Sequence, residues 1–238
     1  MILFEDGPRH DHYSASLVID SSPAALSAQF AGEPDTVFLL GPVYVPLRRD
    51  VRDTGSRDEQ PDHAKHLLLT FGGNDPGDAS SQVLRTVRDD DNWSSITAVL
   101  GPGYRGSLNE ASTNSDRVTI LRDPADYTEH FRQADLALCD AGMTAWEFAW
   151  LGVPMLQWVV SDDQLLNAST FTDSQAAVNL GKLDEFDAEW VHQALAEVRT
   201  DKLLRAMLVD NAKALFDGHG AERIAQEIVH LWQRWNNG

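Results

Sequence analysis

Residues 134–147 read Ala-Asp-Leu-Ala-Leu-Cys-Asp-Ala-Gly-Met-Thr-Ala-Trp-Glu and carry most of the structural information in this chain. The apolar run 136–139 predicts a buried strand, and the Ala-Gly pair at 141–142 predicts a tight turn. Bulky apolar residues over 143–151 predict a helix, which the Gly-Val-Pro sequence at 152–154 stops. The stretch therefore predicts a strand, a glycine turn and a helix in direct succession.

This turn has two interpretations. Backbone N–H groups at a helix start have no partner within the helix and bind anions, so the turn suits the phosphates of a nucleotide. Glu147 lies in the first turns of the same helix, where a carboxylate can accept hydrogen bonds from sugar hydroxyls. The same pattern also fits an ordinary strand–turn–helix unit with Thr144 as its cap. The stretch by itself leaves both interpretations open.

Strand and helix patterns alternate on either side of this stretch from residue 66 onward. Apolar runs predict further strands at 67–71, 96–100, 118–121 and 155–160. Helical patterns occupy 79–87, 127–133, about 163–176, 187–198, 201–215 and 220–235. Strands that alternate with helices predict an α/β fold with a doubly wound parallel sheet.

The first 65 residues differ from this regular pattern. Residues 1–50 contain three short strand-like runs with too few helices to cover them, which predicts a partial Rossmann-like domain and its connection to the next. Residues 51–65 are charged and polar, which predicts a linker or exposed loop before a domain over 66–238. Because an uncovered sheet edge pairs readily with other strands, the first segment also predicts association with a separate chain or a second copy.

Two more polar loops follow predicted strands. Gly72, Gly73 and Asn74 lie between a strand and a helix, where glycines let a ligand approach the backbone. Gln164 and Asn167 lie three positions apart at the start of a later helix, after Asp residues that are natural helix caps. Because open α/β sheets bind ligands at the carboxyl ends of their strands, the three loops are expected to converge on one edge.

Composition excludes several classes of partner. Asp and Glu outnumber Lys and Arg by 37 to 19, and the formal charge of −18 opposes binding to nucleic acid or anionic lipid. No apolar run reaches membrane-spanning length, so a cytoplasmic location is the default expectation. The single cysteine, Cys139, lies in a predicted buried strand and is interpreted as a core residue. His10 and His12 lack a third ligand at metal-binding spacing, so no metal site is expected.

Six short motifs, taken together in order, resemble those of the GT-B superfamily of MurG-like glycosyltransferases. The motifs are 69–76, 134–137, 141–147, 151–154, 163–168 and 217–223. Within the superfamily the chain resembles in particular the PseG/SpsG family of nucleotide-sugar hydrolases, and segments 4–10 and 40–48 extend that resemblance upstream. The similarity covers essentially the whole chain.

The resemblance implies a GT-B-like fold whose C-terminal Rossmann-like domain holds the UDP part of a nucleotide sugar without a cofactor. The substrate-binding residues that it implies are Gly72, Gly73, Asn74, Gly142, Met143, Thr144, Glu147, Gln164 and Asn167. By this resemblance, the turn after residue 141 binds the diphosphate, and Glu147 binds the ribose hydroxyls. The amides at 164 and 167 face the sugar. Met143 stands where the family often has a serine, which removes one small hydroxyl from the turn.

The front of the chain departs from the family pattern. These hydrolases begin with a Gly-x-Gly-His loop whose histidine is the candidate base, and neither His10 nor His12 matches it. The chain is therefore expected to be N-terminally truncated relative to the family, and no catalytic residue is identified. Three hypotheses stay open: part of a nucleotide-sugar hydrolase in surface polysaccharide or nonulosonate (pseudaminic acid) biosynthesis, a MurG-like glycosyltransferase, and a non-catalytic nucleotide-sugar-binding remnant or subunit.

Overall fold

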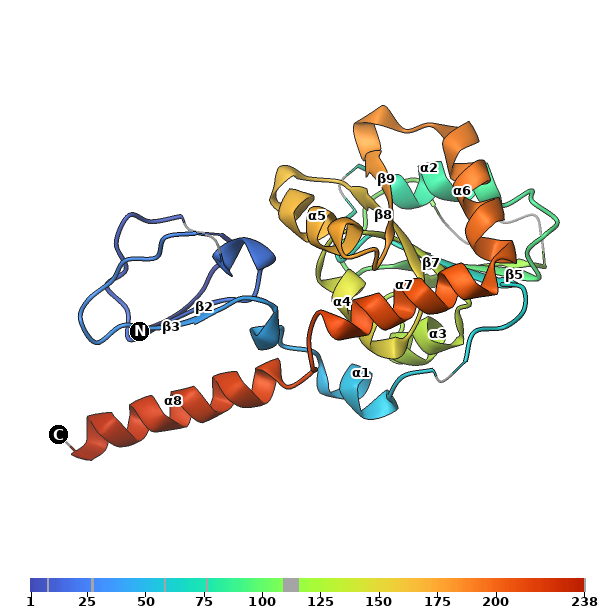
Figure 1. The fold of residues 1–238 in the computed structure, drawn as a ribbon. Coiled ribbons are helices and arrows are strands. Elements are labelled where there is room, and N and C mark those ends of the chain that lie inside the picture. The colour runs from blue at the N-terminus through green and yellow to red at the C-terminus, as the bar shows by residue number, and fades with distance from the viewer. Residues whose placement is uncertain (8, 27, 58, 76, 109–115, 238) are drawn as a thin grey trace. The chain divides into compact units, whose positions relative to one another are not determined.

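Six short apolar strands form the larger of two parallel sheets in the computed structural model, which describes residues 1–238 apart from 8, 27, 58, 76, 109–115 and 238. The strands are β4 (His66–Thr70), β5 (Ser95–Leu100), β6 (Val118–Arg122), β7 (Leu136–Asp140), β8 (Met155–Val159) and β9 (Val178–Lys182) (Figure 1). Their order across the sheet is β6-β5-β4-β7-β8-β9, and all neighbours pair in parallel. Leucine, valine and isoleucine fill the central strands because both faces of a parallel sheet are buried.

Helices connect these strands and cover the sheet. They are α2 (Ala79–Val87), α3 (Tyr127–Gln133), α4 (Met143–Leu151), α5 (Leu165–Asp173), α6 (Ala188–Thr200) and α7 (Lys202–Ala214), with 3-10 turns η4 (Asp162–Gln164) and η5 (Leu183–Glu185). The predicted α/β fold with a doubly wound parallel sheet is confirmed. The chain winds outward from β4 through β5 to β6 and then returns to place β7 on the other side of β4. The winding direction therefore reverses between β4 and β7, where open α/β sheets bind ligands.

Helix α4 ends where the sequence predicts. Gly152 has a left-handed φ of 73°, a conformation that side chains other than glycine disfavour. Trp146 packs against Phe171, and Phe148 packs against Phe131, so α4 joins α5 and α3 through aromatic contacts. These contacts hold the helix, and with it the turn that precedes it, in place.

Parts of the polar segment before β4 are buried, while Asp62, His63 and Lys65 are exposed. Gln60 and Ala64 are buried, and the Gln60 amide donates to the carbonyl of Gly152 at 3.0 Å. The fully buried guanidinium of Arg205 donates to the carbonyls of Val198, Arg199, Pro61 and Asp62. One residue of α7 therefore fastens the segment to the end of α6, and this long-range contact has no signal in local composition. Asp58, within the predicted linker, lies outside the described residues.

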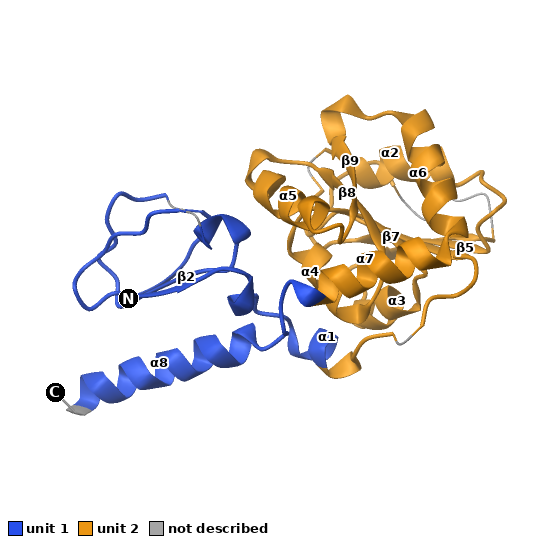
Figure 2. Cartoon of the chain, in the orientation of Figure 1, with its two compact units in different colours: residues 1–52, 214–238 blue, residues 53–213 orange. Residues whose placement is uncertain are grey.

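The chain divides into two compact units, residues 1–52 with 214–238 and residues 53–213 (Figure 2). The first unit contains a parallel sheet of β1 (Ile2–Phe4), β2 (Leu17–Asp20) and β3 (Val37–Leu40), the 3-10 turns η1 (Pro23–Leu26) and η2 (Pro42–Tyr44), and helix α8 (Gly220–Asn237). Helix α1 (Arg49–Thr54) falls at the division. No helix among the described residues is long and apolar enough to cross a membrane.

Helix α8 groups with the first sheet, whereas the sequence assigned it to a domain over 66–238. Ile224 packs with Leu17, Ile19 and Leu39, and further apolar residues of α8 lie against the same cluster. The three strands obtain their cover from the far end of the chain because the first 50 residues supply too little helix of their own. The predicted role of residues 51–65 as a linker between two functional domains stays a prediction.

Candidate functional site

Three loops that follow neighbouring strands meet at the carboxyl edge of the six-stranded sheet. The loop after β4 begins at Gly72, the turn after β7 contains Gly142, and the turn after β8 contains Gln164. All three adjoin the carboxyl group of Asp140, the last residue of β7. The expected convergence is therefore present, and it lies where the winding of the sheet reverses.

Asp140 occupies the centre of this arrangement. Gln164 donates from Nε2 to Asp140 Oδ2 at 2.7 Å. A Cβ atom at Gly142 would lie 2.9 Å from the same oxygen, and one at Gly72 would lie 3.5 Å from it. Gly72 also has a φ of 66°, which disfavours a side chain. Glycine at these two positions therefore brings bare backbone against the carboxyl group.

The surroundings of Asp140 disfavour its charged form. Asp140 is 6% exposed, and its Oδ1 has no hydrogen-bond partner among the described residues. Burial raises the pKa of Asp140 to about 6, and the carboxylates of Asp75 and Asp163 add to the rise, while the bond from Gln164 opposes it. Because perturbed carboxyl groups cluster at functional sites, Asp140 is a candidate site residue that the sequence analysis missed. An acidic residue that ends an otherwise apolar strand was the available signal.

Gln164 uses both ends of its amide within the protein. Its Oε1 accepts from the backbone N–H of Val160 at 3.1 Å, while Nε2 binds Asp140. The predicted shared helix face of Gln164 and Asn167 is divided, because Gln164 ends η4 and Asn167 lies in α5. Asn167 Oδ1 is buried without a hydrogen-bond partner among the described residues. Contact of either residue with a sugar stays a prediction.

The loop after β4 is fixed by backbone packing and by a helix cap. A Cβ atom at Gly101 would lie 2.5 Å from Cα of Gly73, so the loops after β4 and β5 touch backbone to backbone. Asp75 caps α2 by accepting from the N–H groups of Ala79 at 2.7 Å and Ser80 at 2.9 Å. Gly73 and Asn74 are exposed at the tip. Pro76, part of the predicted motif, lies outside the described residues.

Asp78 ties the loop after β5 to the start of α2. It accepts hydrogen bonds from the Tyr104 hydroxyl and from both the N–H and the hydroxyl of Ser107. Burial, together with the bond to Asp78, raises the pKa of Tyr104 to about 12, so the phenol stays protonated as a donor. The loop of Gly72 and Gly73 is therefore fixed by the backbone at Gly101 and by the start of α2, which Asp78 bonds to the loop after β5.

The start of α4 presents backbone rather than a side-chain cap. Gly142 is the N-cap residue, and no side chain makes the capping bond there, so the predicted cap by Thr144 is not present. Met143 is 47% exposed beside it. The half-buried Glu147 accepts at Oε1 from the hydroxyl of Tyr127 at 3.0 Å. Tyr127, on α3, is a second residue that the sequence analysis missed, because nothing in local spacing relates it to Glu147.

A cavity of about 350 Å³ lies at the carboxyl ends of β8 and β9. It is lined by Gly77, Gln82, Val159, Val160, Ser161, Asp162, Lys182, Leu183 and Asp184. Lys182 brings a cation to this edge, where it pairs with Asp162 at 3.1 Å. The hydrogen bond and charge of Asp162 raise the pKa of Lys182. The volume falls in the range of small-molecule sites, and an ammonium group is suited to a phosphate.

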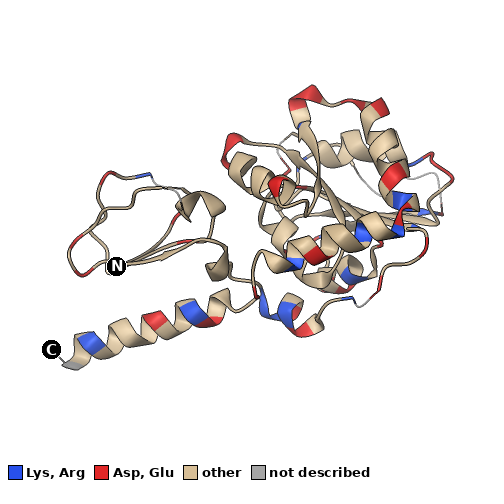
Figure 3. Ribbon diagram, viewed as in Figure 1, with Lys and Arg blue, Asp and Glu red and all other residues tan. Residues whose placement is uncertain are grey.

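Cys139 is fully buried, as predicted, and burial raises the pKa of its thiol well above the ordinary value. Within the described part of the chain, no group of three or more His, Cys, Asp or Glu side chains could hold a metal ion. Acidic residues are spread over the elements of both units (Figure 3).

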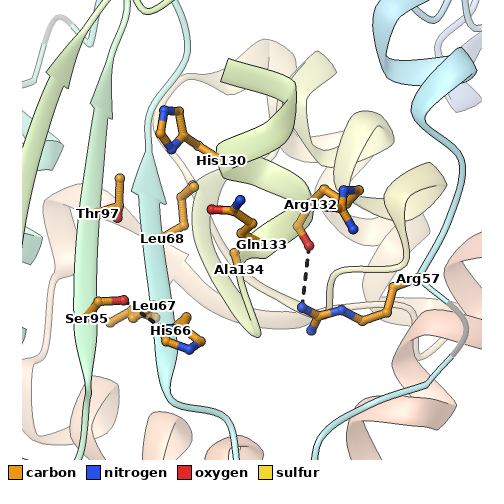
Figure 4. A pocket seen from close by; sticks show the side chains of 10 residues that line it. All are labelled: Arg57, His66, Leu67, Leu68, Ser95, Thr97, His130, Arg132, Gln133 and Ala134. Carbon is orange, nitrogen blue, oxygen red and sulfur yellow. Dashed lines mark hydrogen bonds between the residues drawn. The ribbon is translucent and has the colours of Figure 1, made fainter. Parts of the chain in front are cut away.

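The opposite, amino edge of the sheet holds a second cavity, of about 320 Å³, lined by side chains that include Arg57, His66 and Ser95 (Figure 4). Asp135 accepts from the Arg57 guanidinium at 3.0 Å and from the N–H groups of Lys65 and His66 at 2.9 and 3.0 Å. The His66 imidazole lies 2.8 Å from the Ser95 hydroxyl. Hydrogen bonds within the protein therefore fix the start of β4 at this edge.

Comparison with known proteins places the fold in a wider group. The glycosyltransferase family 28 C-terminal domain matches residues 54–228. The spore coat polysaccharide biosynthesis protein SpsG of Bacillus subtilis is 21% identical over 239 residues, 98% of this chain and 70% of that protein. The protein MJ1062 of Methanocaldococcus jannaschii is 26% identical over 168 residues, 66% of this chain. The chain spans only about a third (34%) of the length of MJ1062.

Solved structures confirm the GT-B-like architecture. MurG of Acinetobacter baumannii has a TM-score of 0.60 and 17% identity, covering 91% of this chain and 60% of that one. The rhamnosyltransferase SpnG, solved with thymidine diphosphate, has a TM-score of 0.59 and 18% identity, covering 90% of this chain and 57% of that one. At such identities the likeness concerns the fold.

Proposed function

Because this chain belongs to the glycosyltransferase family 28 C-terminal domain family, we propose that it binds the nucleotide diphosphate of a nucleotide sugar at the carboxyl edge of its six-stranded sheet. The observation that carries the proposal is the meeting of the loops of Gly72, Gly142 and Gln164 around Asp140 at the point where the winding reverses. Sites of this kind bind nucleotides in open α/β sheets because helix starts and glycine turns meet there.

We propose that the diphosphate binds at the start of α4. With Gly142 as the N-cap and no side chain capping the helix, backbone N–H groups of the first turn can donate to phosphate oxygens. Thr144, two residues after Gly142, is half-buried, and its hydroxyl supplies an additional donor. Lys182, on the same sheet edge, supplies positive charge in a chain that is otherwise strongly acidic.

The ribose is assigned to Glu147. Its side chain lies one turn into α4, and the Tyr127 hydroxyl donates to Oε1 and so restricts the carboxylate. A carboxylate can accept from both hydroxyls of a ribose because its two oxygens carry several lone pairs. Gly73 and Asn74 are exposed on the adjoining loop and are proposed to contact the phosphates or the sugar. Gln164 and Asn167 are proposed to contact the sugar.

The favoured reaction is hydrolysis of a nucleotide sugar to the nucleoside diphosphate and the free sugar, in the synthesis of a surface polysaccharide or a nonulosonate. The match to SpsG over 98% of this chain favours that class. Transfer of the sugar to an acceptor, as by a MurG-like enzyme, is the second candidate, and the fold shared with MurG supports it. Binding without catalysis is the third. We propose UDP as the nucleotide, a cytoplasmic location, and a separate chain or second copy that completes the first unit.

Calorimetric titration with UDP and a UDP-sugar tests the binding site. Glu147→Ala should weaken binding of both by about tenfold or more, because a charge-assisted hydrogen bond to ribose is lost. Glu197→Ala is the matched control, since that glutamate is exposed on α6, and its affinity should equal that of the wild type. Absence of binding by any nucleotide or nucleotide sugar would sink the proposal.

Release of UDP from UDP-sugars distinguishes the three candidates. Release in water alone supports hydrolysis, and release only with an added sugar acceptor supports transfer. Binding without release under either condition supports a non-catalytic subunit. Because binding is measured separately, a negative turnover result leaves the assignment of the site intact.

A further inference from the structure

Among the described residues, no Lys, Arg or His side chain is paired with Asp140. Its carboxyl group ends the central strand β7, and among the described residues its one side-chain partner is the neutral amide of Gln164. The negative charges of two further carboxylates, Asp75 in the loop after β4 and Asp163 in η4, act on it and raise its pKa. The nearest residue along its own strand, Cys139, carries a buried neutral thiol. The first turn of α4 contributes no acidic residue to this environment.

Glycine backbone lies beside this carboxyl group in two of the loops that are proposed to bind the diphosphate. Cβ atoms at Gly142 and Gly72 would lie 2.9 and 3.5 Å from Asp140 Oδ2, so no side chain intervenes at either position. A diphosphate on the N–H groups after Gly142 would bring negative charge close to a buried carboxylate. In surroundings poor in water, such like charges repel strongly.

We propose that the site binds a nucleotide diphosphate together with a proton, and that Asp140 is the residue that takes up the proton. This inference rests on the proposed function and adds a binding role for a residue that the family resemblance does not assign. Oδ2 accepts from Gln164, so the proton belongs on Oδ1, which has no hydrogen-bond partner among the described residues. Neutral Asp140 then keeps its bond to Gln164 while the repulsion of the ligand is removed.

The proton makes binding depend on pH in a defined direction. Burial raises the pKa of Asp140 to about 6 before any ligand is present, and an anion beside it raises that pKa further. Affinity is therefore highest below about pH 6 and falls as the pH rises through the interval between the two pKa values, by at most about tenfold per pH unit. A carboxylate that merely held Gln164 in place would keep its charge and show no such coupling.

UDP-glucose is a suitable probe because each of its phosphates has one ester and one anhydride linkage, so only a strongly acidic group remains on each and neither titrates in this range. The terminal phosphate of UDP does titrate, near pH 6, and would confuse the measurement. Calorimetry in two phosphate-free buffers of different ionisation enthalpy gives the number of protons taken up by the wild-type protein. At about pH 7 the expected result is uptake of a fraction of a proton for each UDP-glucose bound.

Asp140→Asn tests the residue directly, since asparagine keeps the shape and an oxygen for Gln164 but cannot ionise. Its affinity should change less than about twofold between roughly pH 5.5 and 8, whereas the wild type should weaken by about tenfold or more. Asp163→Asn removes an exposed carboxylate of the same charge nearby and should retain the dependence of the wild type. Unchanged pH dependence in Asp140→Asn would overturn the inference and leave the proposed function standing.

The wild-type measurement covers the case in which Asp140→Asn does not fold. Binding of UDP-glucose without net proton uptake overturns the inference on its own, again without touching the proposed function. Failure of every variant to bind UDP-glucose at any pH contradicts the proposed function and, with it, this inference.

Discussion

Asp135 and Asp140 lie at opposite edges of the same sheet and are equally buried, with 6% of each residue exposed, yet their partners differ. Asp135 accepts three hydrogen bonds, one of them from an arginine, and these fasten the start of β4. Asp140 is bonded by one amide and has an oxygen with no hydrogen-bond partner among the described residues. Burial therefore does not distinguish a structural carboxylate from a functional one, whereas hydrogen-bond satisfaction does.

The contacts of Asp135 and Arg205 are expected to stabilise the fold, and the largest loss of stability is expected on substitution of Arg205. Arg205→Met should lower the free energy of unfolding by about 3–5 kcal/mol, because buried carbonyl groups lose their charged donor. Lys202→Met is the control, since its ion pair with Asp62 is exposed and screened by solvent, so the loss should be much smaller. Urea denaturation at neutral pH measures both. Equal losses in the two variants would show that the segment before β4 is not fastened by Arg205.

The carboxyl edge should respond in the opposite direction. Asp140→Asn should raise the free energy of unfolding by about 1–3 kcal/mol at about pH 7.5, measured without ligand. The folded pKa of about 6 exceeds the unfolded value, so the contribution of Asp140 is complete below the unfolded pKa and is lost as pH rises through the folded pKa. The gain should therefore vanish near pH 4. A destabilised variant at neutral pH would mean that Asp140 is as structural as Asp135.

The smallest expected effect concerns Tyr127. Tyr127→Phe removes the hydroxyl that donates to Glu147 and should change the free energy of unfolding by less than about 1 kcal/mol. Affinity for UDP-sugars should fall by a few-fold because the carboxylate is less well oriented. Tyr44→Phe, in η2 of the first unit, is a matched substitution that should leave affinity unchanged. An unchanged affinity in Tyr127→Phe would remove Tyr127 from the site.

The elements with local signals were predictable from the sequence. The apolar run of β7, the glycine turn and the helix that ends at Gly152 follow from spacing alone, and the structure contains them. The alternation of strands and helices likewise predicts the doubly wound sheet. The meeting of the three loops follows because the carboxyl ends of parallel strands share one edge.

Contacts between distant residues were not predictable from local patterns. The Arg205 guanidinium binds a segment more than 140 positions away, so polar composition alone did not show that Gln60 and Ala64 in this segment are buried. The amide of Gln164 was expected to face a sugar, whereas its bonds to Asp140 and Val160 depend on how β7 and β8 lie side by side. The packing of α8 on the first sheet was not predictable either. Apolar periodicity shows that a helix has a buried face, but it does not show which element covers that face.

The grouping of residues 1–52 with 214–238 has a consequence for the order of folding during synthesis. All the strands of the six-stranded sheet are synthesised before α8, so this sheet does not depend on α8 in order to form. The first sheet, in contrast, waits for a helix encoded about 180 codons after β3. The apolar cluster that these strands form with α8 is therefore incomplete throughout that interval.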